Sequence, residues 1–175
     1  SSRNTCRDLP VGTITVLPFE EYVARVLPAE VYASWAPAAL QAQAIAIRTY
    51  AWYQILRQQQ AEYDVTDSTS HQYMCDYRYP STDAAVAATQ GFYLSYEGQV
   101  ILAQYSAENS HPTLDGGLPY LRPVADPVGL GKARYGHGRG LSQWGAQRWA
   151  SQYGWNPVQI LAHYYTGAQV VDPLG

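Results

Sequence analysis

A glycine-rich run near the C-terminal end of the chain, GHGRGLSQWGA at residues 136–146, gathers side chains that could bind a ligand. Its glycines allow tight turns and a close approach of the backbone to a ligand. Between them, His137, Ser142 and Gln143 supply hydrogen-bond donors and acceptors, and Trp144 adds a flat apolar ring. The mixture indicates a polar ligand cleft, with a simple glycine-rich turn into a helix as the alternative. Trp144 fits a sugar platform and a core position equally well.

Glu30 is the residue best suited to acid–base chemistry. It stands between Ala29 and Val31, with Leu27 one helical turn before it. Apolar surroundings disfavour the ionised form of a carboxyl and raise its pKa. A rise from about 4.3 towards roughly 6 costs about 2 kcal/mol and leaves a usable protonated fraction near neutral pH. The residues alone leave open an ordinary glutamate at a helix end, or a structural ion pair with Arg48.

Polar side chains also interrupt the apolar stretch that follows Glu30. A guanidinium buried there needs a partner, which for Arg48 we expect to be Glu30 or a loop carbonyl. Gln41 and Gln43 could reach a cleft beside this stretch, although amides on helix surfaces are common. These residues support a site only if the stretch is a helix that packs next to Glu30.

Several blocks spread over most of the chain occur in an order that is itself informative. They are Glu21-Tyr22-Val23, Ala29-Glu30, ALQAQAIAIRTYA at 39–51, Tyr105-Ser106, PYLRPVADP at 119–127, Gly136-His137-Gly138, and Ser142-Gln143. In this order the blocks resemble those of the SpoIID family, which comprises stage II sporulation protein D and the related amidase-enhancer LytB proteins. Several motifs in the same order are far more specific than any single one.

The resemblance implies a peptidoglycan lytic transglycosylase, and Glu30 matches the glutamate that such enzymes use. They cleave the bond between N-acetylmuramic acid and N-acetylglucosamine. The glutamate first protonates the leaving oxygen; it then accepts the proton of the muramoyl C6 hydroxyl, which attacks C1 and gives a 1,6-anhydro sugar. Because this nucleophile belongs to the substrate, the second carboxylate of glycoside hydrolases is not needed. The residues expected to hold the substrate are Gln41, Arg48, Tyr105, Ser106, His137, Ser142 and Gln143.

Two departures from the family pattern concern the cleft. The family usually has a Gly-Gly-x-Thr turn after the Ser106 block, where this chain has ENSHPT at residues 108–113. The family often carries a long insertion between the VADP and GHG motifs, where this chain has only residues 128–135. A shorter cleft favours the alternative function, a module that binds wall glycan and enhances an amidase without cleaving anything. The presence of Glu30 favours the enzyme, and neither function implies a cofactor.

The two cysteines, Cys6 and Cys75, lie far apart in the sequence. In a secreted protein such a pair predicts one disulfide, here tying an extended tail at residues 1–10 to a central loop. The alternative is zinc, because His71 and Cys75 have ligand-like spacing, Cys6 could join them, and some SpoIID relatives bind zinc nearby. Structural zinc takes four Cys or His ligands, and only these three candidates are evident. We therefore expect the disulfide and no metal.

The composition fits one domain, residues 1–175, and restricts its partners. With 11 Lys and Arg against 14 Asp and Glu, the net charge is −3, which suggests neither nucleic acid nor an anionic membrane. No apolar run approaches the roughly 20 residues of a membrane span. No signal peptide is visible, which is compatible with a mature secreted form acting at the cell wall. The 16 Tyr and 5 Trp suit sugar rings, so the expected partners are glycan strands, with a wall amidase as a further candidate that the family resemblance adds.

The elements that position these residues predict an α+β fold. An amphipathic helix starts at Pro18, and Pro28 ends or kinks it, which places Glu30 at or just past its C-terminus. Residues 37–59 form a helix that is apolar almost all round and therefore central and buried. The other expected elements are a short helix closing at Gly91, a hairpin of 92–96 and 99–105, helices at 141–153 and from Pro157, and a strand at 168–171. We expect the central helix to pack on a small, largely antiparallel sheet, with the loop at 106–140 helping to form the cleft.

Overall fold

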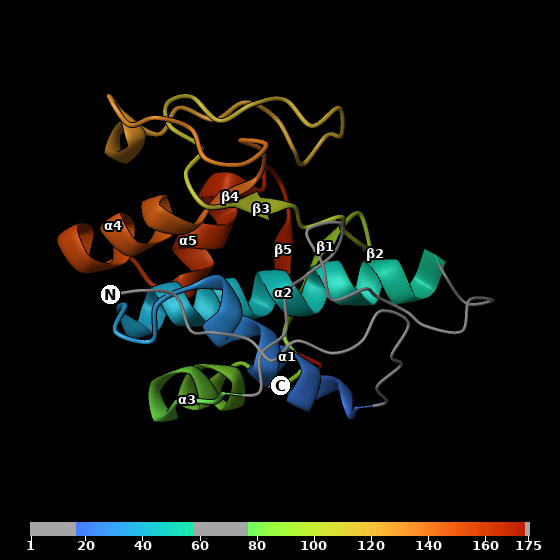
Figure 1. Cartoon of the computed structure of the whole chain (residues 1–175). Coiled ribbons are helices and arrows are strands. Elements are labelled where there is room, and N and C mark those ends of the chain that lie inside the picture. The colour runs from blue at the N-terminus through green and yellow to red at the C-terminus, as the bar shows by residue number, and fades with distance from the viewer. Residues whose placement is uncertain (1–16, 58–76, 174–175) are drawn as a thin grey trace, which may run out of the picture.

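The computed structural model describes residues 17–57 and 77–173, which form a single domain of mixed helix and sheet (Figure 1). The elements are α1 (Phe19–Glu30), α2 (Pro37–Arg57), α3 (Pro80–Ala88), β1 (Tyr93–Tyr96), β2 (Gln99–Val100), β3 (Tyr105–Ser106), the 3-10 turn η1 (Pro127–Gly129), β4 (Leu141–Ser142), α4 (Gln143–Tyr153), α5 (Pro157–Tyr164) and β5 (Gln169–Val171). The predicted α+β class is confirmed.

Helix α2 runs through the middle of the molecule, with α1 and α3 on one side and α4, α5 and the β3–β4 pair on the other (Figure 1). One flank of α2, with Leu40 and Ile47, packs against Val23 and Leu27 of α1. The opposite flank, with Ile45, joins a second core that includes residues of β1, β4 and α5. The predicted central buried helix is thus confirmed. Within the described ranges, no helix is long and apolar enough to cross a membrane.

Helix α1 carries Glu30 as its last residue. Pro18 precedes its first turn, where a proline's fixed φ suits a helix start, and the helix continues through Pro28 for two more residues. The chain then turns extended at Val31, whose backbone N–H still donates to the Leu27 carbonyl oxygen at 3.1 Å. The prediction that Pro28 would leave Glu30 at the end of this helix is confirmed.

The hairpin of β1 and β2 forms as predicted around Glu97 and Gly98. Both turn residues have positive φ, 51° and 78°, as the favoured two-residue hairpin turn requires. The register pairs Tyr96 with Gln99, and β5 adds to the other edge of β1 in antiparallel fashion. The second strand is shorter than expected and ends at Val100. Beyond it the chain makes a tight turn, closed by the Gln104 N–H donating to the Leu102 carbonyl at 2.9 Å.

Strands β3 and β4 form a separate parallel pair that the local sequence patterns did not predict. Tyr105 aligns with Leu141 and Ser106 with Ser142. The expected helix at 141–153 therefore begins two residues later, because Ser142 caps it by accepting a hydrogen bond from the Gly145 N–H at 3.2 Å.

The remaining helix signals correspond closely to the structure. The C-cap of α4 is Gly154, in the left-handed conformation, and Asn156 caps α5 by accepting from the Gln159 N–H at 2.8 Å. Helix α3 begins at Pro80, with Thr82 Oγ1 accepting from the Tyr79 N–H at 3.3 Å. Short-range capping chemistry thus accounts for where these helices begin and end.

The long segment between β3 and β4 is fastened to α5 and α4 by a buried carboxylate. Asp126 is fully buried and accepts hydrogen bonds from Trp149 Nε1 at 2.9 Å and the Tyr164 hydroxyl at 2.6 Å. Its Oδ1 also lies 3.1 Å from His163 Nε2. Burial, followed by the charge of Asp126, raises the pKa of Tyr164 well above 10, so the hydroxyl remains a donor. This network fixes the segment on the helices beneath it.

A second carboxylate, Glu108, anchors the same segment near its start. It is 3% exposed and accepts from Arg148 Nη2 at 2.6 Å. The other guanidinium nitrogen, Arg148 Nη1, donates to the Val128 carbonyl at 3.1 Å. The segment is therefore an ordered part of the fold although it contains little regular secondary structure.

Candidate active site

Glu30 and Gln143 meet where the end of α1 faces the start of α4. Gln143 Nε2 donates a hydrogen bond to Glu30 Oε2 at 3.2 Å, across 113 positions of the chain. The carboxyl is half-buried, while its neighbours Ala29 and Val31 are 5% and 2% exposed. The apolar setting expected for Glu30 is present, and the structure brings one of its predicted companions into direct contact with it.

Tyr105 lies at the side of this meeting point. It is half-buried on β3, and its ring contacts that of Tyr50 on α2 edge-on, with centroids 6.1 Å apart. Just beyond β3, the Ala107 carbonyl accepts a hydrogen bond from the Trp144 N–H at 3.0 Å. The strand is thus joined directly to the first turn of α4, the turn that carries Gln143.

Ser106 and Ser142 lie inside the protein, which corrects the expectation that they contact substrate. They are 7% and 0% exposed. The Ser106 hydroxyl accepts from the Gly138 N–H at 3.2 Å and donates to Asn109 Oδ1. The Ser142 hydroxyl, besides capping α4, accepts from the Asn109 N–H at 3.2 Å. Both side chains therefore hold the glycine-rich run and the loop after β3 together.

The glycines of the run are needed for close approach to β3 rather than to a ligand. Gly136 and Gly140 have φ of 101° and 68°, which side chains rarely adopt. A Cβ at Gly136 would lie 2.5 Å from Ser106 Cβ, and one at Gly140 would lie 2.1 Å from the Gln104 carbonyl oxygen. The alternative of a glycine-rich turn into a helix therefore describes the backbone of this run, while the side chains of His137 and Trp144 are exposed.

His137 is exposed on this run, next to the backbone of Tyr105. Its Nδ1 accepts a hydrogen bond from the Arg139 N–H at 2.9 Å, so the proton of the neutral ring is on Nε2. Partial desolvation, and then the positive charge of Arg139, lower the pKa of His137, while a hydrogen bond with the Tyr105 backbone opposes the shift. His137 is therefore a neutral donor at pH 7, four residues before the strand β4 that leads to Gln143.

Arg48 does not face a cleft. It is 2% exposed, and its Nε and Nη2 donate to the two carboxylate oxygens of Glu20 at 2.9 and 2.8 Å. Its Nη1 donates to the Phe92 carbonyl at 2.9 Å. The expected loop carbonyl is present, but the carboxylate partner is Glu20 rather than Glu30. Arg48 ties the start of α1 to the start of β1, which corrects the expectation that it binds substrate.

The two glutamines of α2 point in different directions. Gln41 is half-buried and lies two helical turns before Arg48, on the same face. Gln43 lies two turns before Tyr50, on the face that reaches Tyr105. Gln43 is 1% exposed, and its Oε1 and Nε2 have no hydrogen-bond partner among the residues that the structure describes. Gln41 and Gln43 thus occupy different faces of α2 and differ in burial, a distinction that their equal side chains conceal in the sequence.

Cys6, His71 and Cys75 lie outside the described residues, so the disulfide and the alternative zinc site both stay predictions. Within the described part of the chain, no group of three or more His, Cys, Asp or Glu side chains could hold a metal ion.

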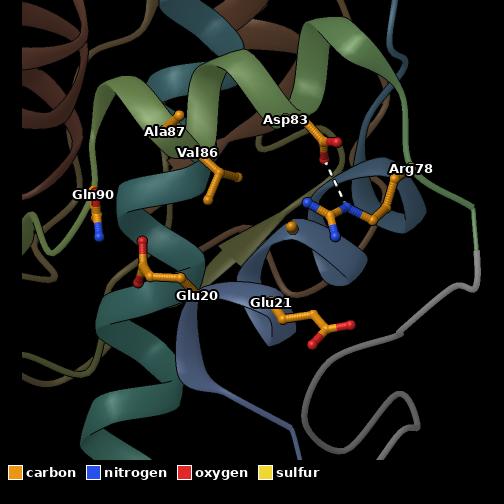
Figure 2. A pocket seen from close by; sticks show the side chains of 8 residues that line it. Glu20, Glu21, Arg78, Asp83, Val86, Ala87 and Gln90 are labelled. Atoms are coloured by element: carbon orange, nitrogen blue, oxygen red, sulfur yellow. Dashed lines mark hydrogen bonds and ion pairs between the residues drawn. The ribbon is translucent and has the colours of Figure 1, made fainter.

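A hollow between the start of α1 and helix α3 is separate from Glu30 (Figure 2). Its rim carries the Arg78–Asp83 ion pair at 3.0 Å. The full lining is Glu20, Glu21, Ala24, Arg78, Asp83, Val86, Ala87 and Gln90. Glu20 is already engaged by Arg48, and the hollow is open to solvent, so it offers no catalytic constellation.

Comparison with known proteins adds two curated relatives and one family. The chain is 34% identical over 120 residues to an uncharacterized protein of Brachyspira hyodysenteriae, covering 63% of this chain and 33% of the relative. It is 37% identical over 103 residues to the amidase enhancer of Bacillus subtilis, covering 55% of this chain and 14% of the relative. A sequence model described as SpoIID, stage II sporulation protein, matches residues 9–96, half of the chain, including Glu30. The chain belongs to the SpoIID family.

Proposed function

We propose that this domain acts on the bacterial cell wall as a peptidoglycan lytic transglycosylase. Membership of the SpoIID family and the similarity to an amidase enhancer support a role at the wall. The observation that carries the enzymatic step is the half-buried Glu30 carboxyl, held by Gln143 at 3.2 Å between α1 and α4. Because the chain spans only part of its relatives, the proposal concerns the domain described here.

The geometry suits an acid that later becomes a base. Gln143 Nε2 donates to Oε2 of Glu30, and in this proposal Oε1 carries the transferable proton. The C-terminal end of a helix bears partial negative charge, and it opposes the ionised carboxylate in the resting state. After Oε1 protonates the glycosidic oxygen, the carboxylate formed takes the proton of the muramoyl C6 hydroxyl, which attacks C1. His137 and Tyr105 would hold the sugars from the β3–β4 side.

A binding module that enhances an amidase is the second candidate. Two observations favour it: the similarity to the amidase enhancer of Bacillus subtilis, and the short segment between the VADP and GHG motifs. Such a module would hold glycan strands at the same surface and leave their bonds intact. The enzyme would leave 1,6-anhydro ends on the glycan and the module would leave the glycan unchanged, so chemical analysis of the glycan distinguishes the two candidates.

The deciding experiment is mass spectrometry of muropeptides after incubation of purified glycan strands with the full chain. We expect 1,6-anhydro ends from the native protein and none from Glu30→Gln, because an amide is nearly isosteric but cannot donate and recover a proton. The matched control is Glu21→Gln on the same helix, whose carboxylate binds Arg25 at 2.9 Å. Reducing ends would show a hydrolase, and unchanged strands that still bind would show the module. Activity above a few per cent in Glu30→Gln would exclude Glu30 as the acid.

A further inference from the structure

Three aromatic rings gather on the surface next to Glu30 and Gln143, and we name Tyr32, Trp35 and Trp144 the aromatic platform. The ring centroids of Tyr32 and Trp35 lie 5.7 Å apart, those of Tyr32 and Trp144 5.8 Å, and those of Trp35 and Trp144 4.9 Å. Trp144 is 38% exposed, and the other two rings are partly exposed. The rings are tilted or edge-on to one another, with interplanar angles of 53°, 53° and 60°, and part of each ring meets solvent here.

The platform is continuous with the candidate active site along both chain segments. Tyr32 follows Glu30 by two residues, which limits the separation of their Cα atoms to roughly 7 Å. Trp144 directly follows Gln143, the residue that donates to Glu30. The hydrogen bond between Glu30 and Gln143 thus closes the gap between the two segments that carry the rings. The aromatic platform and the Glu30 carboxyl are therefore neighbours on the surface of the domain.

Contacts beneath the rings hold the platform in place. The Trp35 segment is tied to α4 by the Ala36 N–H, which donates to Gln147 Oε1 at 2.8 Å. The Arg148 guanidinium lies against the Trp144 ring, 6.0 Å from its centroid, and its charge is met by Glu108 at 2.6 Å. A preformed surface loses little conformational entropy when it binds a ligand. Since Arg148 is neutralised, the surface favours an uncharged ligand over an anion.

We propose that the aromatic platform is a stacking subsite for an N-acetylhexosamine ring of a glycan strand, adjacent to the ring on which Glu30 acts. The inference rests on the proposed function in that it takes the Glu30 site to be where a glycan lies. An aromatic face offers an apolar surface of the right kind for the C–H face of a sugar, and it needs no charge. The half-buried Glu30, held by Gln143, supplies a polar group beside this apolar surface, as in a typical mixed ligand site.

The test measures binding of N-acetylglucosamine tetramers by calorimetry, with every variant built on Glu30→Gln so that cleavage plays no part. Stacking worth about 0.5–1.5 kcal/mol corresponds to a loss of affinity of about 2- to 13-fold in Trp144→Ala. Trp144→Phe keeps an aromatic face and is expected to retain most of the affinity. The matched control is Trp52→Ala: Trp52 is 41% exposed, and it lies roughly 22 Å along α2 from Pro37, at the far end of the helix.

Equal affinity in Trp144→Ala and its parent, an equal loss in Trp52→Ala, or no binding of the tetramer by the parent overturns the subsite. If Trp144→Ala does not fold, the deciding measurement is the quenching of tryptophan fluorescence by acrylamide. It is made on Trp52→Phe, which removes the exposed indole that lies away from the platform. Bound tetramer must then reduce the quenching of Trp144. The proposed function fails if the native protein produces no anhydro ends. The subsite is still supported in that case if binding of the tetramer weakens in Trp144→Ala.

Discussion

The buried amide of Gln43 is expected to lower the stability of the fold, and replacing Gln43 with methionine tests this expectation. Its side chain is 1% exposed, and neither polar atom has a partner among the described residues. A buried polar group left unsatisfied costs about 1–3 kcal/mol. Methionine has a similar length, no branch and a similar helix propensity, so it fills the same space. We therefore expect Gln43→Met to raise the free energy of unfolding by about 1–3 kcal/mol.

For a chain of this length, that gain corresponds to roughly 2–12 °C in the melting temperature. Urea unfolding followed by circular dichroism measures the free energy, and calorimetry measures the melting temperature. Gln41→Met is the matched control, since Gln41 is half-buried on another face of α2, where we expect a change within about 0.5 kcal/mol. Destabilisation by Gln43→Met with a neutral control would refute the reasoning, because the amide would then have a partner in the folded protein.

The same variant has a second readout, the production of anhydro ends from glycan strands. Unsatisfied buried groups persist where function requires them, at a cost in stability. We expect cleavage to fall in Gln43→Met while stability rises, because Gln43 lies on the α2 face that leads to Tyr50 and Tyr105. If Gln43→Met is more stable and keeps full activity, the Gln43 amide takes no part in the reaction.

Three further predictions concern residues that support the site. Glu20→Gln leaves the buried Arg48 cation without its counter-charge; since Glu20 is 32% exposed, we expect a loss of about 1–3 kcal/mol in urea unfolding rather than the 3–5 of a fully buried pair. Gly140→Ala places a Cβ 2.1 Å from a backbone oxygen at a φ of 68° and should cost more than about 2 kcal/mol, seen as a lower melting temperature. His137 should titrate by NMR below the usual value of about 6.5, and Arg139→Gln should raise its midpoint. Because the folded-state pKa is lowered, the stability that neutral His137 contributes is complete above pH 6.5 and is lost as the pH falls towards the folded-state pKa.

Helix boundaries in this chain follow from local chemistry and could therefore be predicted. Pro18, Gly154 and the pair Asn156-Pro157 each act within one helical turn. The parallel pair of β3 and β4 could not, because its two strands are short, far apart in the sequence and carry no alternating pattern of their own. Local signals identify elements, whereas the pairing of remote short strands depends on the packed whole.

The candidate site divides in the same way. The apolar flanks of Glu30 can be read from adjacent residues, but its contact with Gln143 was suggested only by the family resemblance. Arg48 was expected to meet Glu30 or a loop carbonyl; it meets the Phe92 carbonyl, and the packing of α1 on α2 brings Glu20 to it instead of Glu30. The Ser142 hydroxyl could bind a ligand by its chemistry, but in the structure it accepts a hydrogen bond from the Gly145 N–H and caps α4. The type of a side chain shows which bonds it can form, and the packing of the fold decides which partner it meets.

The segment that leaves β3 at Ser106 returns to β4 at Leu141, one position from the residue that pairs with Ser106. Its two ends are therefore neighbours, and the entropy of closing such a loop grows only slowly with its length, by about 0.6 kcal/mol for each doubling. Exposed residues between the anchors at Glu108 and Asp126, such as Asp115 and Arg122, can be exchanged while the buried Asn109 and Leu121 hold the segment in place and the strands deliver Gln143 to Glu30. The exposed part of this segment can therefore vary in sequence without moving the contact between Glu30 and Gln143.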